Sequence, residues 1–344
     1  MTSTGDKLQQ DVRNWLSPPD PWKNHILARG SRHGTTGTWW IQGDTYAKWK
    51  VSGPSSLLWI HGKRPYIALA CSFPQLMITV SAAGAGKSVI WYDKLSIVRV
   101  HELMLLASSA IIEDIRTLQR SGLASLAFFY CDFTDDQKKD LRGLLSSLLV
   151  QLGGQSNAYS AVLSDFYLTH GRGSQQASDI ELLGCLKDML NLPRQATVHL
   201  VIDALDECPV TTGLVFTRKN VLELVEELVN LHIPNLRICV TSRPEVDIID
   251  VLEKTAFCSI SLHGESGQVQ DIAKYIESFV HTSREMGRWK ATDRQLVVDE
   301  LTNKADGMYV IHATLLISLV HICNVGSVGP SVSLSTSVVA SQDA

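Results

Sequence analysis

Short apolar runs and amphipathic stretches alternate along most of the chain, and they predict strands and helices in turn. The runs of strand type lie at residues 57–60, 76–80, 126–131, 198–203, 236–242 and 257–262. Amphipathic helices are expected between them, at residues 111–118, 141–152, 158–169, 180–190, 220–232 and 246–253. Strands that alternate with helices pair in parallel through crossover connections. The pattern therefore predicts a three-layer α/β fold with a mostly parallel five-stranded sheet.

The two ends of the chain depart from this alternation. Residues 1–50 are rich in proline and tryptophan, and we expect an irregular arm that docks its aromatic rings on the main body, with a ligand-binding aromatic cage as the alternative. The core is expected at 51–263, followed by a partial helical lid at 264–308. Residues 309–344 form a divergent tail that is first apolar and then rich in serine.

Composition excludes several classes of function. A formal charge of -4 over 344 residues is nearly neutral, so no nucleic-acid partner is expected. Seven cysteines occur singly and without a C-x-x-C pair, which favours reduced thiols over a disulfide framework or a zinc site. The polar start lacks a signal-peptide pattern, so a cytoplasmic protein is predicted. The apolar run at 309–325 is interrupted by polar residues and falls short of the ~20 apolar residues that span a bilayer, so membrane association is not expected.

Residues 81–88, of sequence Ser-Ala-Ala-Gly-Ala-Gly-Lys-Ser, have the composition of a phosphate-binding loop after the apolar run at 76–80. The predicted phosphate-binding residues are Gly84, Ala85, Gly86, Lys87 and Ser88. The two glycines let successive N–H groups turn toward a phosphate, the lysine adds a positive charge and the serine hydroxyl can ligate Mg²⁺. One position departs from the pattern G-x-x-x-x-G-K-[ST], because Ser81 stands where the pattern has glycine.

Two further strands end in charged residues that suit the same chemistry. The run at 198–203 ends in Asp203, which can hold a metal ion through water, and Asp206 and Glu207 follow within reach of an attacking water. The run at 236–242 is followed by Arg243, a cation suited to sensing a terminal phosphate. Together with the loop, these strands predict a P-loop NTPase fold; the alternative is that the acidic residues only cap a helix.

These motifs resemble those of the fungal NACHT NTPases of vegetative-incompatibility proteins, whose NTPase region is similar to the amino-terminal domain of nephrocystin-3. The matching segments are 57–63, 84–88, 202–208 and 240–245, and the resemblance covers about residues 10 to 308. It implies a STAND-type signalling ATPase or GTPase, in which the nucleotide controls opening and association with itself or with a protein effector.

The resemblance also implies a role for each matching residue. Lys87 and Ser88 take the phosphate and Mg²⁺ roles, and Asp203 takes the metal-linked acidic role. Asp206 and Glu207 would activate water, and Arg243 would be the sensor. The implied cofactors are Mg²⁺ and ATP or GTP, and no simple code in the sequence decides between the two bases.

The phosphate loop is interrupted by what looks like inserted sequence. Joining Lys63 directly to Ala83 gives Gly-Lys-Ala-Gly-Ala-Gly-Lys-Ser, which satisfies the loop pattern without exception, so 64–82 looks inserted. A second extra segment lies at 91–107. One hypothesis is that both are retained introns in the gene model. The other is a real insertion that rebuilds the entry strand at 76–80, with 57–60 displaced or paired beside it.

Two functions of different classes follow from these patterns. The first is a nucleotide-dependent signalling switch with slow Mg²⁺-dependent hydrolysis, as in fungal self/non-self recognition. The second is a scaffold or interaction module that keeps the fold but has lost nucleotide binding, because its loop is interrupted. A hydrolase of another kind has little support, since the sequence has neither a G-x-S-x-G nor an H-E-x-x-H motif.

Overall fold

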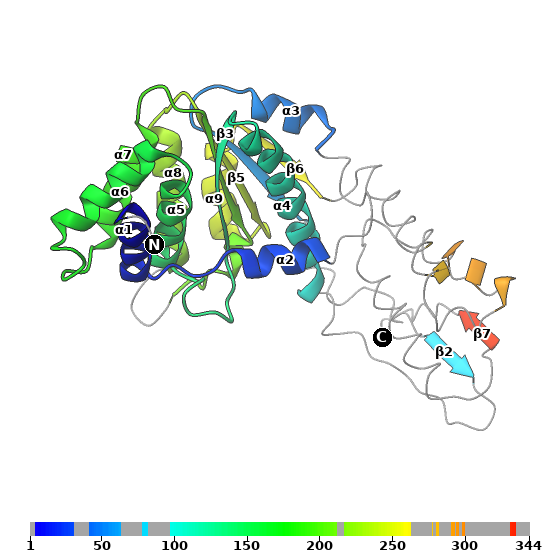
Figure 1. Cartoon of the computed structure of the whole chain (residues 1–344). Coiled ribbons are helices and arrows are strands. Elements are labelled where there is room, and N and C mark those ends of the chain that lie inside the picture. The colour runs from blue at the N-terminus through cyan, green and yellow to red at the C-terminus, as the bar shows by residue number, and fades with distance from the viewer. Residues whose placement is uncertain are drawn as a thin grey trace, which may run out of the picture. The chain divides into compact units, whose positions relative to one another are not determined.

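The chain divides into two compact units in the computed structural model (Figure 1). The core unit consists of residues 1–32, 37–62 and 104–261, and the second unit consists of residues 33–36, 63–103 and 262–344. The structure describes residues 4–30, 41–62, 78–81, 97–211, 217–262, 277, 280–281, 290–292, 294–295, 298–299 and 331–334. None of the helices described there is both long enough and apolar enough to cross a membrane.

A five-stranded sheet forms the centre of the core unit. Its strands are β1 (Ser56–His61), β3 (Ala124–Tyr130), β4 (Thr197–Asp203), β5 (Leu236–Ser242) and β6 (Cys258–Ser261). They lie in the order β3-β4-β5-β1-β6, and every neighbouring pair is parallel. Strands that are buried on both faces need apolar residues throughout, and β3 and β5 are buried along their whole length. The predicted α/β fold with a five-stranded, mostly parallel sheet is confirmed.

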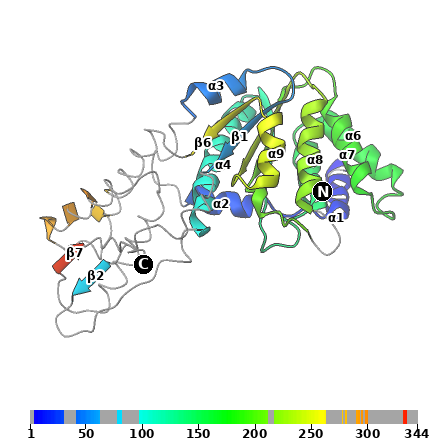
Figure 2. The same ribbon diagram turned by 180° about the vertical axis from the view of Figure 1, so that it is seen from behind.

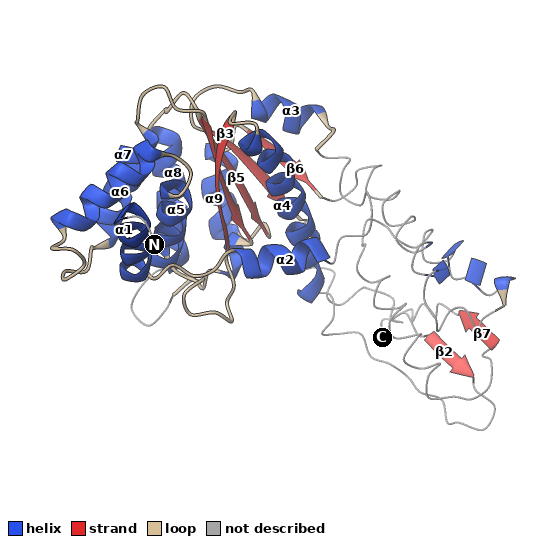
Figure 3. Ribbon diagram, in the orientation of Figure 1, coloured by secondary structure: helices blue, strands red, loops and turns tan. Residues whose placement is uncertain are grey.

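Helices cover both faces of this sheet. The connecting helices are α4 (Ile97–Arg120), α5 (Leu141–Gly153), α6 (Asn157–Thr169), α7 (Asp179–Leu190), α8 (Thr217–Asn230) and α9 (Val246–Thr255). The connection from β1 to β3 runs past β5 and β4 to one edge of the sheet. The later connections, to β4, β5 and β6, run back toward the other edge. Because crossovers are right-handed, α4 and the later helices must lie on opposite faces, as Figures 1 and 2 show. The layers are also clear in Figure 3.

The first 50 residues are more regular than predicted. They form α1 (Thr4–Leu16), α2 (Trp22–Gly30) and α3 (Asp44–Lys50), so the expectation of an irregular arm was wrong. The expected docking of aromatic rings does occur. Trp15 packs against Phe166 and Tyr167 with ring centroids about 5.5 Å apart. Trp49 is fully buried and donates a hydrogen bond to the carbonyl of Ser56 (3.1 Å).

The apolar run at 76–80 does not lead into the core sheet. Its residues contribute to β2 (Ile78–Ser81), which pairs antiparallel with β7 (Ser331–Leu334) in the second unit. The place between β5 and β6 is filled by β1, so no position is left for a second entry strand. The alternative in which 76–80 rebuilds the entry strand was therefore wrong. Apart from β2 and the start of α4, the predicted inserts at 64–82 and 91–107 lie outside the described residues, as does most of the predicted lid.

Candidate functional site

The carboxyl ends of β1, β4 and β5 bring the predicted site residues of the core unit to one edge of the sheet. His61 at the end of β1 is in register with Ser242 at the end of β5, so Gly62 and Arg243 leave the sheet side by side. On the other side of β5, Ile202 is in register with Val240, which places Asp203 at the same edge. In parallel α/β sheets, ligands bind outside the carboxyl ends of the strands where the strand order reverses.

Asp203 is buried and is oriented by two hydroxyl groups. Its Oδ1 accepts hydrogen bonds from Ser108 Oγ on α4 (2.5 Å) and from Thr241 Oγ1 on β5 (2.6 Å). Thr241 Oγ1 in turn accepts a hydrogen bond from the backbone N–H of Ala204 (2.9 Å). The carboxylate is thus held by a hydroxyl on α4 and by a hydroxyl on β5, the strand next to β4. Sequence patterns assigned no role to Ser108 or Thr241, although Thr241 lies in the matching segment 240–245, because a hydroxyl inside an apolar run does not reveal its partner.

A chain of polar contacts connects this region with the amino-terminal helices. The Tyr130 hydroxyl, at the end of β3, lies beside Ser108 and 2.9 Å from Nδ1 of His25 on α2. Nε2 of His25 lies 2.8 Å from Glu113 on α4. Burial lowers the pKa of His25, and the nearby Glu113 carboxylate opposes this shift only in part. These contacts fasten α2 to the face of the sheet that carries α4.

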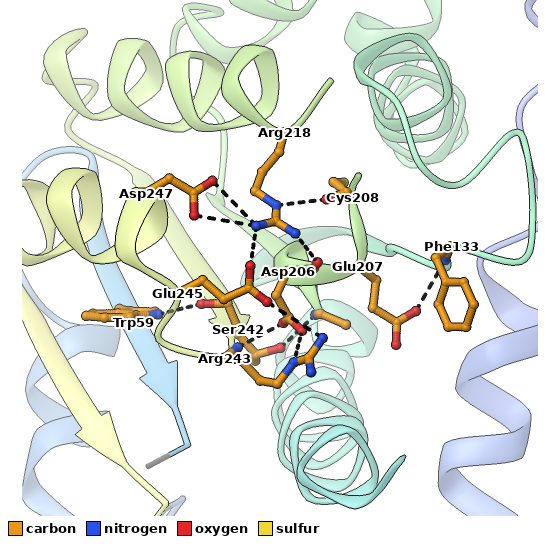
Figure 4. Close-up of polar contacts among 12 residues, drawn as sticks. Trp59, Phe133, Asp206, Glu207, Cys208, Arg218, Ser242, Arg243, Glu245 and Asp247 are labelled. Carbon is orange, nitrogen blue, oxygen red and sulfur yellow. Dashed lines mark hydrogen bonds and ion pairs between the residues drawn. The ribbon is translucent and has the colours of Figure 1, made fainter. Parts of the chain in front are cut away.

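The acidic residues after Asp203 lie on a tight turn. Ala204 has a left-handed backbone with φ of 53°, which turns the chain sharply into the short 3₁₀ helix η2 (Leu205–Glu207). Glu207 is partly exposed, and its Oε2 accepts a hydrogen bond from the backbone N–H of Phe133 (3.3 Å). Asp206 points the other way and is buried. The two carboxylates predicted to activate water thus have different surroundings (Figure 4).

Asp206 and Arg243 form an ion pair with each other. Oδ1 of Asp206 accepts from the backbone N–H of Arg243 (2.8 Å), and Oδ2 accepts from its Nε (2.6 Å). Arg243 Nη2 also lies 3.7 Å from Glu245 Oε1. Burial lowers the pKa of Arg243, but the hydrogen bond and charge of Asp206, with Glu245 and Glu207, outweigh that effect and raise the pKa overall. The guanidinium therefore remains charged.

Arg218 on α8 is a further buried cation at this edge, and no sequence motif singled it out. Its guanidinium contacts the backbone carbonyls of Asp206 and Cys208 and the side chains of Glu245 and Asp247 (Figure 4). A lone arginine at the start of a helix gives no signal in a sequence. Its partners come from two loops that only the folded sheet brings together.

One of the residues that would hold a magnesium ion, Asp203, lies in the described part of the chain. Mg²⁺ is usually bound through one or two carboxylates together with water and substrate phosphates. A single carboxylate at the strand end, Asp203, fits this pattern. The described residues contain no cluster of three histidine, cysteine or acidic side chains that could enclose a metal without a nucleotide. The predicted phosphate-binding residues 84–88 lie outside the described residues, so their roles stay predictions.

Comparison with known proteins finds similarity over part of the chain. The family described as "Nephrocystin 3, N-terminal" matches residues 105–243, which is less than half of the chain. The match begins after residues 84–88 and ends at Arg243, so it includes Asp203, Asp206 and Glu207.

A solved structure of the Aeropyrum pernix ORC2 protein, in ADPNP and ADP complexes, is also similar to this chain. The TM-score is 0.44 with 11% sequence identity, and the alignment covers 90% of this chain and 64% of that chain. This chain therefore spans less than two thirds of the length of that protein. No curated protein sequence matches the chain.

Proposed function

We propose that the core unit binds a nucleoside triphosphate with Mg²⁺ at the carboxyl edge of its sheet and works as a nucleotide-dependent switch with slow hydrolysis. The observation that carries the proposal is the meeting of Asp203, Arg243 and the end of β1 at that edge. In this proposal Lys87 and Ser88 of the predicted phosphate loop supply the contacts to the phosphates and to Mg²⁺. The match to the nephrocystin 3 family over 105–243 adds support, because it includes these charged strand ends.

Each residue has a physical role in this proposal. Lys87 and the glycine N–H groups bind the phosphates, and Ser88 and Asp203 hold Mg²⁺, which neutralises charge that develops on the transferred phosphoryl group. Glu207 orients the attacking water, because it is the more exposed of the two carboxylates on the turn. Arg243 contacts the terminal phosphate after its ion pair with Asp206 is exchanged for that contact. Positioning and charge stabilisation supply most of the catalysis in such reactions.

Signalling of the NACHT type, with self-association or an effector, is the finer part of the proposal. It rests on the resemblance of the motifs at 84–88, 202–208 and 240–245 to those of fungal NACHT proteins. The expected behaviour is a nucleotide-dependent change of oligomeric state. Light scattering after size-exclusion chromatography, with ADP and with a non-hydrolysable triphosphate, measures that change directly.

A scaffold without nucleotide binding is the second candidate function. The observation that favours it is the ion pair between Asp206 and Arg243, which occupies both groups with each other. Thermal unfolding separates the two candidates, since a ligand that binds only the folded chain raises its melting temperature. Millimolar Mg²⁺-ATP or Mg²⁺-GTP should stabilise the chain, and Lys87→Ala should abolish the effect. An unchanged melting temperature with both nucleotides would favour the scaffold.

A further inference from the structure

Arg218 connects the segments that carry the predicted hydrolysis groups. It is the second residue of α8 and is 5% exposed. Its Nε donates to the carbonyl of Cys208 (2.8 Å), and its Nη2 donates to the carbonyl of Asp206 (2.6 Å). Its Nη1 pairs with Glu245 and lies 3.4 Å from both carboxylate oxygens of Asp247. Figure 4 shows the guanidinium at the centre of these contacts.

The two carbonyl contacts lie on either side of Glu207. Because the guanidinium is planar and rigid, binding the carbonyls of Asp206 and Cys208 fixes the orientation of two peptide groups, the one just before Glu207 and the one just after Cys208. The Glu207 side chain then extends away from Arg218 toward Phe133 (Figure 4). The turn also receives a backbone hydrogen bond from Arg218 N–H to the carbonyl of Pro209 (3.0 Å). The position of the Glu207 carboxylate therefore depends on Arg218.

The contacts of Arg218 with carboxylates lie near Arg243, the predicted sensor. Glu245 is shared, since its Oε2 pairs with Arg218 and its Oε1 lies 3.7 Å from Arg243. Arg218 thus holds in place the carboxylate that lies beside the predicted sensor. A buried arginine is costly unless it is paired and hydrogen-bonded, and here all three guanidinium nitrogens have acceptors. Such a residue is well suited to fix two loops with respect to each other.

We propose that Arg218 is a positioning residue that sets both Glu207 and Arg243 for nucleotide hydrolysis. This inference rests on the proposed function of the same site. Arg218 acts through other residues, because within the described part of the chain its polar contacts are with the turn at 206–209 and the start of α9. Lysine cannot replace it, since an ammonium group is a point charge and cannot bind two carbonyls and a carboxylate in one plane.

The test compares Arg218→Lys and Arg218→Met in the full chain with Lys219→Met as the matched control. Lys219 is the next residue of α8, and it is exposed and pairs only with Glu223 among the described residues. Both Arg218 variants should lower turnover about 10- to 100-fold, the loss expected when reacting groups are misplaced by about 1 Å. Nucleotide affinity should change by less than about threefold, because the phosphate-binding residues are untouched. Lys219→Met should match the wild type in both measurements.

Hydrogen exchange supplies a readout that does not depend on hydrolysis. In both Arg218 variants, peptides that contain 205–208 and 243–247 should exchange faster, while those from β4 and β5 should keep their protection. Wild-type turnover in Arg218→Met, or faster exchange across the whole core unit, would overturn the positioning role. If the wild type neither binds nor hydrolyses nucleotide, the proposed function fails. In that case, hydrogen exchange of the peptides that contain 205–208 and 243–247 still tests whether Arg218 positions the two loops.

Discussion

Thr241 connects Asp203, the aspartate proposed to hold Mg²⁺, to the neighbouring strand β5. Its hydroxyl donates to Asp203 and accepts from the N–H of Ala204, and its side chain is fully buried. Valine has the same shape but cannot make either hydrogen bond. The left-handed turn at Ala204 would then lose the partner that holds it.

We therefore expect Thr241→Val to lower the free energy of unfolding by about 1–3 kcal/mol, the cost of leaving buried polar groups unpaired. Urea denaturation monitored by circular dichroism measures this change. Thr117→Val is the matched control, because Thr117 lies exposed on α4 and, among the residues that the structure describes, its hydroxyl bonds only to carbonyls of its own helix. Equal stability of the Thr241→Val chain and the wild type would show that these hydrogen bonds do not hold the turn.

His199 makes the stability of the core unit dependent on pH. It is 2% exposed on β4 and packs edge-on against Trp49. Burial, followed by the charges of Arg237 and Lys50, lowers its pKa to about 4. The unfolded chain then binds more protons than the folded chain between about pH 4 and pH 6.5, so stability falls as the pH is lowered through this range.

From pH 7 to pH 5, this histidine should lower the free energy of unfolding by about 2 kcal/mol. The leucine variant, His199→Leu, removes the titrating group and fills much of the same volume. Its stability should therefore fall less than that of the wild type between the two pH values, as measured by urea denaturation. Parallel stability curves for both chains would contradict the assignment of this effect to His199.

At the scale of elements, two glutamines satisfy the backbone groups at the β3 edge of the sheet. β3 is an edge strand, and α5 lies beside it. Gln151 accepts from the N–H of Phe128 and donates to its carbonyl, and Gln155 does the same with Leu126. Each side-chain amide thus takes the place of a residue on a neighbouring strand. Open strand edges are a common route to association between chains.

The double variant Gln151→Ala/Gln155→Ala should lose about 1–3 kcal/mol of stability for each glutamine, since alanine has a good helix propensity but leaves the backbone groups unpaired. It should also associate through the open edge, which light scattering detects. Gln10→Ala on α1 is the control, because within the described ranges that side chain bonds only to Asn14, at the surface. A double variant with the oligomeric state and the stability of the wild type would argue against this protective role.

Local sequence patterns were sufficient to place some elements and site residues, and they were not sufficient for others. Asp203 and Arg243 could be placed because each ends a continuous apolar run, and parallel pairing brings such ends to one edge. The entry strand could not be chosen between 57–60 and 76–80, since both are apolar and only pairing with β5 and β6 distinguishes them. α1 could have been found. Its Leu8, Val12, Trp15 and Leu16 recur with helical spacing, but the nearby prolines and tryptophans hid that signal.

At the scale of the whole molecule, the division into two units bears on the interrupted loop. Residues 63–103 belong to the second unit together with 262–344, whereas β1 and the strands that pair with it lie in the core unit. The boundary between the two units therefore falls directly after Gly62. The roles of residues 84–88 could be predicted from composition alone, and they stay predictions because these residues lie outside the described part of the chain.

Removal of residues 64–82 should restore an uninterrupted phosphate loop, because Lys63 would then be followed by Ala83. The shortened chain should keep the cooperative unfolding of the core unit and bind Mg²⁺-nucleotide more tightly than the full chain. Fluorescent-nucleotide titration gives both dissociation constants, and Lys87→Ala in the shortened chain is the control. A shortened chain that folds but binds no better would show that the segment is not an interruption.

We propose that the edge formed by β1, β4 and β5 is a Mg²⁺-nucleotide site. Calorimetric titration of the full chain measures nucleotide binding at this site. Titration with ATP and GTP, with Mg²⁺ and with EDTA, compares the wild type with Asp203→Asn. We expect the wild type to bind at least one nucleotide. Mg²⁺ should strengthen this binding, and Asp203→Asn, which keeps the side-chain shape, should remove most of that gain. Absence of binding in the wild type, or the same response to Mg²⁺ in both chains, would contradict the proposal.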